Sequence, residues 1–92
     1  MSEKVKEITK VRNKLGLHVR PAAQIAKILQ KRNAKVTLTY KGQTVNARSI
    51  MSIMILAAPK NAQLQIEAEG SDAQETLDEL LKAFYTKFGE DG

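Results

Sequence analysis

The sequence predicts an α/β (α+β) open-faced sandwich, in which three helices cover one face of a four-stranded antiparallel sheet. Residues 63–69 alternate apolar and polar side chains, which is typical of a strand with one buried and one solvated face. Residues 22–30 and 72–88 carry apolar side chains at helical spacing instead. At 92 residues, with no repeat or linker, the chain is expected to form a single domain, 1–92.

The first strand is expected within residues 5–11, which are rich in β-branched side chains. Val5 and Ile8 are out of phase with strict alternation, which suggests a bulge or a late strand start. The first helix is expected over residues 22–30, with Pro21 in its first turn, where the missing N–H is harmless. Asn33 suits a left-handed conformation just after that helix.

Residues 36–40 and 43–45 read as two strands of a hairpin, because Gly42 between them can supply a positive φ. Ser49 is placed to cap a short helix over residues 50–56. A strand remains possible there from the apolar run alone. In that helix, Ile53 and Leu56 are assigned to the core.

The last strand is expected over residues 63–69. Ser71 or Asp72 then caps the final helix. The apolar stripe of this helix consists of Leu77, Leu80, Leu81, Phe84 and Phe88. The predicted order is therefore βαββαβα.

Cysteine is absent, which excludes disulfides, thiolate metal sites and a cysteine nucleophile. The chain begins with charged residues, and its longest apolar run, 53–59, is too short to span a bilayer. We therefore expect a cytoplasmic protein with no membrane partner.

The net charge of +5 favours an acidic partner, which could be a nucleic acid or an acidic protein surface. Single-strand-binding modules usually combine basic residues with aromatic stacking platforms, whereas aromatic residues make up only 4% of this chain. We therefore expect no nucleic-acid partner. A basic nucleic-acid-binding α/β domain remains the alternative from another class, and it would bind with a steep salt dependence and no need for the histidine.

The only histidine, His18, lies between a glycine-containing loop and the predicted first helix. Amides at a helix N-terminus lack intrahelical acceptors and attract anions, so Gly16, Leu17 and Val19 are expected to help stabilise a phosphoryl group. The planar fork of Arg20 suits the same group. An ordinary imidazole titrates near pH ~6.5, so a neutral ring nitrogen is available as a nucleophile in the cytosol.

A lone histidine is more often an ordinary loop residue or a helix cap than a nucleophile. The sequence also shows no phosphate-binding loop, no metal-ligand cluster and no catalytic triad. We therefore expect no cofactor and no metal, and a phosphoryl carrier rather than a stand-alone enzyme. The neighbours of His18 decide between these roles.

Those neighbours resemble the HPr family of the bacterial sugar phosphotransferase system, whose signature is Gly-Leu-His-Ala-Arg-Pro-Ala; Gly16, Leu17, His18, Arg20, Pro21 and Ala22 match it. The resemblance implies that Enzyme I phosphorylates His18 on Nδ1, with phosphoenolpyruvate as ultimate donor, and that a sugar-specific enzyme IIA removes the group. Arg20 would stabilise the phosphoryl group. A regulatory or nitrogen-related phosphotransferase branch is the alternative role.

A second stretch, residues 46–51, resembles the segment that carries the regulatory serine of that family. Ser49 would then be a target of an HPr kinase/phosphorylase. The chain departs from the family pattern at Val19, where a small residue is usual, and at Ser52 and Asn61, where glycine is common. Asparagine is the next-best residue for a positive φ, so the resemblance implies that conformation for Asn61 in the turn before the last strand. These changes leave the nucleophile in place.

An exposed docking patch is expected on the short helix, formed by Ile50, Met51 and Met54. Flexible methionines suit a surface that fits several partners in turn. Three cations are expected to ring this patch and steer it to acidic partners: Arg20, Lys27 and Arg48. Phosphate on Ser49 would weaken the docking. We expect the chain to act as a monomer.

Overall fold

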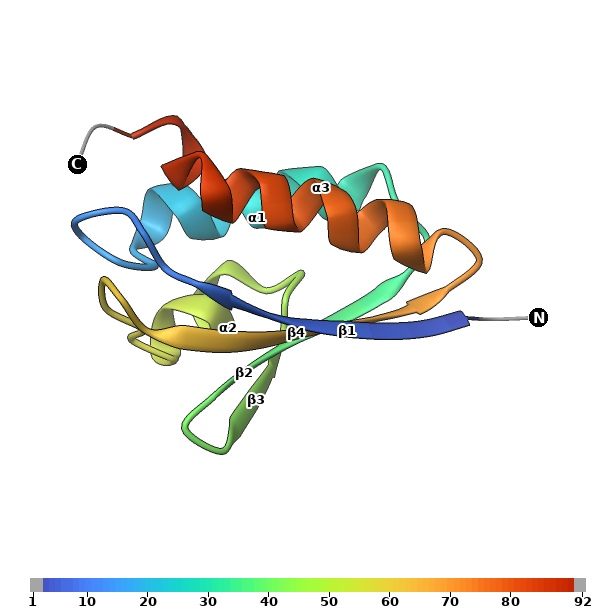
Figure 1. Cartoon of the computed structure of the whole chain (residues 1–92), viewed down its shortest axis with the longest axis horizontal. Coiled ribbons are helices and arrows are strands. Elements are labelled where there is room, and N and C mark those ends of the chain that lie inside the picture. The colour runs from blue at the N-terminus through green and yellow to red at the C-terminus, as the bar shows by residue number, and fades with distance from the viewer. Residues whose placement is uncertain (1–2, 91–92) are drawn as a thin grey trace.

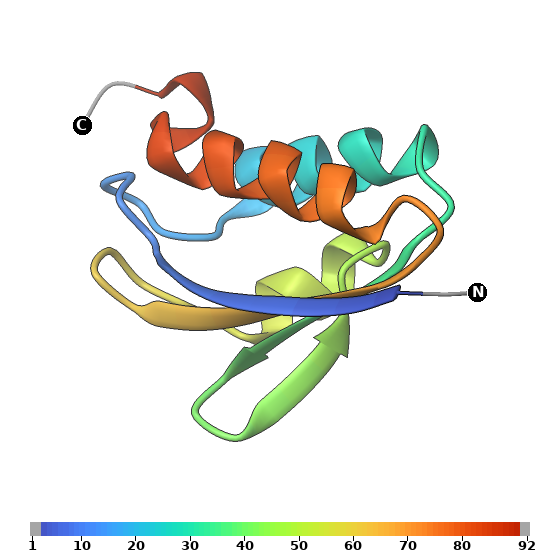
Figure 2. The same cartoon turned by 45° about the vertical axis from the view of Figure 1, so that its right-hand side comes forward.

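A computed structural model, which describes residues 3–90, has a four-stranded antiparallel sheet in the order β1-β4-β2-β3. The elements are β1 (Glu3–Lys10), α1 (Val19–Gln30), β2 (Lys35–Tyr40), β3 (Gln43–Asn46), α2 (Ile50–Ile55), β4 (Gln63–Gly70) and α3 (Ala73–Tyr85). The helices lie on one face of the sheet and leave the other face open (Figures 1 and 2). The predicted fold class and element order are confirmed. Residues 1–2 and 91–92, which the sequence assigns to the same domain, lie outside the described part.

The central strand β4 pairs with β1 on one side and β2 on the other. Its alternating residues Leu64, Ile66 and Ala68 are buried under the helices, as predicted. The register of β1 against β4 is continuous, so the expected bulge is wrong. Ile8 pairs with Gln65 and therefore lies on the open face of the sheet, where it is exposed.

The core lies between the sheet and the two long helices. Helix α1 contributes Ile25 and Leu29, and α3 contributes Leu77, Leu80 and Phe84. Within residues 3–90, none of the helices has the length and apolar composition to cross a membrane.

Phe88 joins this core from a turn beyond α3, not from the helix itself as the sequence predicted. Helix α3 ends at Tyr85, and the next residues form the single 3₁₀ turn Lys87–Gly89, in which all three have positive φ. The ring of Phe88 packs edge-on against Phe84, with 4.9 Å between the centroids. The chain thereby reverses after α3 and approaches the loop before α1 (Figures 1 and 2).

Several turn predictions can be checked directly. Gly42 has the expected positive φ of 80° in the hairpin, and Asn61 has a φ of 75°. Asn33 is not left-handed, because Asp72 holds this connection instead: its carboxylate accepts hydrogen bonds from the amides of Asn33 and Ala34. Asp72 stands at the N-cap position of α3 but makes no side-chain cap bond, so that prediction is wrong.

Candidate functional site

The loop that presents His18 is braced by the segment that leads into β4. Gly16 has a φ of 69°, and a Cβ atom there would lie 2.4 Å from the carbonyl oxygen of Ala58 and 2.9 Å from Cα of Pro59. The next residue, Leu17, is buried and donates its amide to the same Ala58 oxygen at 3.0 Å. Only glycine fits this approach, so Gly16 shapes the loop.

These contacts correct the expected role of two loop amides. The amide of Gly16 donates to the carbonyl of Asn13 at 3.1 Å, and that of Leu17 is bound to Ala58. Both donors are used inside the loop, so Gly16 and Leu17 position the site and do not offer amides to a phosphoryl group.

His18 is the N-cap residue of α1, with extended backbone angles, and its side chain makes no capping hydrogen bond. The alternative that His18 is a helix cap is thus met in position, but its side chain does no capping. Helix α1 begins at Val19, three residues earlier than predicted, so Pro21 falls within the first turn. Since Pro21 has no N–H, the amides of Val19 and Arg20 are the donors that this turn offers beside the imidazole.

The imidazole contacts a carboxylate from the far end of the chain. Nε2 of His18 lies 2.9 Å from Oε2 and 3.1 Å from Oε1 of Glu90. The buried amide of Asn13 donates to Oε1 of Glu90 at 3.0 Å and to the carbonyl of Gly16 at 2.6 Å. Three separated parts of the sequence thus meet at His18.

Sequence reasoning missed both Asn13 and Glu90. Neither stands in a pattern that marks it, because Glu90 follows the last predicted helix and reaches His18 only through the left-handed turn. Gly89 directly follows Phe88, the last apolar residue of that predicted helix, and was the one local signal that the chain reverses there.

The electrostatics keep this carboxylate ionised. Burial raises the pKa of Glu90, but hydrogen bonds from His18 and Asn13, with the charges of His18 and Arg20, outweigh burial and lower the pKa below its usual value. The side chain is only 12% exposed. At neutral pH a sheltered negative charge therefore faces Nε2.

Arg20 is less constrained. Its Nε lies 3.9 Å from Oε2 of Glu90, at the limit of an ion pair, and its side chain is 66% exposed. The His18 side chain is itself 29% exposed, so a second molecule can reach the ring. A long, exposed ion pair is weak, so the guanidinium can turn toward an anion on the imidazole.

A hollow of about 270 Å³ lies next to the imidazole. It is lined by Leu15, Leu17, His18, Met54, Ala57, Ala58 and Pro59. Met54 links this hollow to the α2 patch, which we define as Ile50, Met51 and Met54. All three side chains are exposed, with Met51 at 74%, whereas Ile53 and Leu56 are buried as predicted.

The cap of α2 is also as predicted. Ser49 stands at the N-cap, and its hydroxyl accepts a hydrogen bond from the amide of Ser52 at 3.2 Å. Two further exposed apolar side chains near the site were not predicted from the sequence. They are Leu15 in the His18 loop and Ile55 at the end of α2. They add apolar surface on the elements that carry the hollow and the patch.

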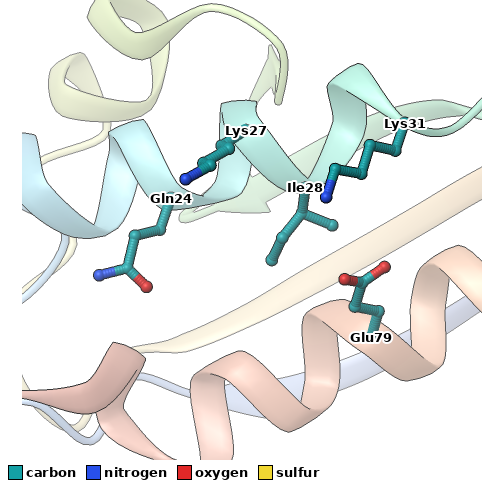
Figure 3. A pocket seen from close by; sticks show the side chains of 5 residues that line it. All are labelled: Gln24, Lys27, Ile28, Lys31 and Glu79. Carbon is teal, nitrogen blue, oxygen red and sulfur yellow. The ribbon is translucent and has the colours of Figure 1, made fainter.

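The cations expected around the patch differ in their contacts. The guanidinium of Arg48 is bound to the carbonyls of Leu29, Arg32 and Ala34 at 2.6 to 3.0 Å, so the structure uses it to close the C-terminal end of α1. Lys27 lines a hollow of about 420 Å³ between α1 and α3. Its other lining residues are Gln24, Ile28, Lys31 and Glu79 (Figure 3).

Comparisons with known proteins point to one family. The family model described as "PTS HPr component phosphorylation site" matches residues 5–86. A phosphocarrier protein HPr of Chlamydia trachomatis is 42% identical over 80 residues, which cover 87% of this chain and 73% of the relative. The phosphocarrier protein NPr of Escherichia coli is 33% identical over 88 residues, or 95% of this chain and 98% of that protein.

Solved structures agree. A crystal structure of HPr-C-His from Thermoanaerobacter tengcongensis has a TM-score of 0.91 and 33% identity, covering 96% of this chain and 99% of the other. An HPr from Bacillus anthracis has a TM-score of 0.84 and 38% identity, covering 88% and 96%.

Proposed function

Because the chain belongs to the HPr family of phosphotransferase-system phosphocarriers, we propose that His18 accepts a phosphoryl group from Enzyme I and passes it to an enzyme IIA of a sugar phosphotransferase system. The observation that carries this proposal is the imidazole at the N-cap of α1, partly exposed and not used as a cap. That position gives a phosphoryl group on the ring access to the positive end of the helix dipole.

The other groups at the site suit a bound phosphoryl group. It brings about two negative charges at neutral pH, which need donors. The amides of Val19 and Arg20 supply two, and the Arg20 guanidinium can supply a bidentate pair once it leaves its long contact with Glu90. Val19 contributes through its backbone, so its branched side chain does not remove that donor.

The carrier itself needs little machinery. Neutral imidazole is both a nucleophile and a leaving group, so the phosphoryl group can be gained and lost with activation supplied by the partners. We propose that the chain acts as a cytoplasmic monomer without a cofactor. The α2 patch and the hollow beside His18 form one docking surface for Enzyme I and enzyme IIA in turn, with Lys27 and Arg20 attracting acidic partner surfaces.

Regulation at Ser49 belongs to the same proposal. Ser49 is half-buried at the start of α2, directly before Ile50 of the patch. Phosphate placed there by an HPr kinase/phosphorylase would set charge beside apolar docking residues and weaken partner binding.

The proposal is tested by incubating the protein with phosphoenolpyruvate and Enzyme I. We expect an acid-labile, base-stable adduct that His18→Ala abolishes and that Ser49→Ala, the control, retains. NMR spectra of each variant verify folding. Labelling that survives in His18→Ala would overturn the assignment.

A second candidate is a carrier for the regulatory or nitrogen-related branch. The similarity to the NPr proteins of Escherichia coli and Klebsiella oxytoca, at 33% and 34% identity over 95% of this chain, favours it. Competition between the two kinds of Enzyme I, with His18 labelling rates compared at equal concentration, distinguishes the branches. Faster labelling by the regulatory enzyme would assign the chain to the second branch.

A further inference from the structure

We propose that a hollow between the beginning of β2 and the end of β3 binds the phosphate group of a small phosphorylated molecule. The hollow has a volume of about 500 Å³ and is lined by Lys35, Val36, Thr37, Asn46 and Arg48. None of these residues lines the hollow beside the imidazole. Binding there is therefore separate from the phosphocarrier function and does not depend on it.

The residues that line this hollow bring hydrogen-bond donors and no carboxylate. Lys35 has an ammonium group, Thr37 a hydroxyl group and Asn46 an amide NH₂ group. Two other hollows with basic side chains each include a carboxylate, Glu79 in one and Glu90 in the other. The lining of the hollow between β2 and β3 is therefore the one of these three that suits an anion.

Arg48 is held in place and still has donors to offer. A guanidinium has five N–H groups, and three hydrogen bonds join that of Arg48 to the carbonyls of Leu29, Arg32 and Ala34. Within residues 3–90, its Nε–H group and the second N–H group of Nη1 make no hydrogen bond. A side chain that is already ordered loses little conformational entropy when it binds an anion.

The amide of Asn46 is oriented by the residue that follows the next one. Its Oδ1 accepts a hydrogen bond from the backbone amide of Arg48 at 2.9 Å. Because that backbone group can only donate, the atom that faces it must be the oxygen. The other end of the Asn46 amide, Nδ2, makes no hydrogen bond to the described residues. The local fold therefore sets this donor before a ligand binds.

The charges of the hollow match a dianion. Lys35 and Arg48 carry one positive charge each, and a phosphate monoester carries about two negative charges at neutral pH. Lys35 pairs with Glu69 in the sheet, but among the described residues their side chains form no ion pair. Glu67, two residues earlier on β4, lies 3.7 Å from Lys4 of β1 instead. The ammonium group of Lys35 is therefore available to a ligand.

The volume of the hollow favours an ester over a free phosphate ion. Sites for small molecules usually measure about 300–1,000 Å³, so this one has room for a short carbon skeleton beyond the phosphate group. Val36 and the aliphatic stems of Lys35 and Arg48 offer apolar surface to that skeleton. A phosphate ester should therefore bind more tightly than inorganic phosphate.

The first experiment titrates the ¹⁵N-labelled protein with glycerol 3-phosphate and records amide chemical shifts at constant pH and ionic strength. We expect saturable shifts for residues 35–37 and 46–48. Inorganic phosphate should shift the same amides at higher concentrations, whereas glycerol should not. An anion at the His18 site is recognised separately, from the amides around His18 and Arg20. Shifts confined to those amides, or shifts around the hollow that do not saturate, would overturn the proposal.

The second experiment repeats the titration with two variants of the hollow. Asn46→Asp keeps the oxygen that accepts from the Arg48 amide but replaces the Nδ2 donor by a negative charge. Lys35→Gln removes one cation from an exposed position. Each variant should bind glycerol 3-phosphate about tenfold more weakly or worse, as expected for the loss of one charge-assisted hydrogen bond.

Matched controls lie at the other end of the same hairpin. Gln43→Glu makes the same change of net charge as Asn46→Asp, and Lys41→Gln the same change as Lys35→Gln, both at exposed positions. The controls should bind as tightly as the unmodified protein, and the amide spectra verify that all four variants are folded. Affinity that falls equally in a variant and its control would reveal a general charge effect and reject a site between β2 and β3.

Discussion

The guanidinium of Arg48 donates a 2.6 Å hydrogen bond from Nη1 to the carbonyl of Leu29 in the last turn of α1. Its Nη2 adds bonds to the carbonyls of Arg32 and Ala34, so one side chain ties the end of α1 to the connection that leads into β2. A cation at this end also complements the helix dipole. The residue before the α2 cap is thus tied to the helix that has His18 at its N-cap.

Replacing Arg48 by alanine is expected to destabilise the fold. Three carbonyls lose a hydrogen bond from the guanidinium, although that of Leu29 keeps the one from the Arg32 amide. We expect a loss of about 1–2 kcal/mol in unfolding free energy, measured by urea denaturation. Arg48→Lys should recover only part, because an ammonium cannot reproduce the fork. Lys27→Ala, the control on exposed α1 surface, should change stability by less than about 0.5 kcal/mol. Unchanged stability in Arg48→Ala, with weaker Enzyme I binding, would instead support a docking role.

Two glycines with similar φ provide a matched test of the His18 loop. Gly16→Ala places a Cβ atom 2.4 Å from a backbone oxygen, whereas Gly42→Ala meets nothing within 4 Å. Gly42→Ala should cost about 1 kcal/mol from its left-handed backbone alone. Gly16→Ala must also shift the segment of Ala58 and Pro59, so we expect a loss of about 3 kcal/mol or more by urea denaturation. Equal losses in the two variants would contradict the close approach.

Much of the fold was predictable because burial alternates or repeats along the chain. Three features follow from side chains that are close together in the sequence. They are the alternation in β4, the apolar spacing in α1 and α3, and the Ser49 cap. The bulge predicted from Ile8 is wrong because one exposed isoleucine on the open face looks the same in sequence as a core residue. Burial alone separates the two cases.

The site was predictable only in its local part. His18 and Arg20 stand next to a helix start that Pro21 marks, so their proximity follows from a few residues. Glu90 depends on the left-handed backbone of Lys87 and Phe88, non-glycine residues that rarely adopt it. Asp72 was misassigned for a similar reason, since its partners, Asn33 and Ala34, lie in a distant connection.

Asp72 predicts a specific pH dependence. The amide of Asn33 lowers its pKa, burial opposes this, and the amide of Ala34 lowers it further, with a net value below the ordinary one. A carboxyl group whose pKa is lower in the folded state stabilises the fold above its unfolded pKa of about 3.9, and this contribution is lost as the pH falls through the folded pKa.

Asp72→Asn should therefore be less stable than the unmodified protein at pH 7, and the difference should shrink under acid conditions. Thermal unfolding between pH 2 and pH 7, followed by circular dichroism, measures both. Asp78→Asn serves as a control within α3, where Asp78 accepts a hydrogen bond only from Gln74 across one turn. A difference that stays constant with pH would mean that ionisation of Asp72 plays no part.

Ser49 separates a structural role from a regulatory one. Ser49→Ala loses the bond to the Ser52 amide and should lower stability by about 1 kcal/mol, whereas Ser49→Asp retains a capping oxygen and should stay near the unmodified value. The aspartate nevertheless adds charge beside the α2 patch.

If the α2 patch docks partners, Ser49→Asp should weaken Enzyme I binding by about tenfold, measured by titration calorimetry, because apolar surface must then be buried next to an unpaired charge. Ser71→Asp adds the same charge at the exposed turn before α3 and serves as the control. Equal weakening by both variants would indicate a general charge effect. A loss confined to Ser49→Asp would place the docked partner on the α2 patch, since stability and net charge are matched between the two proteins.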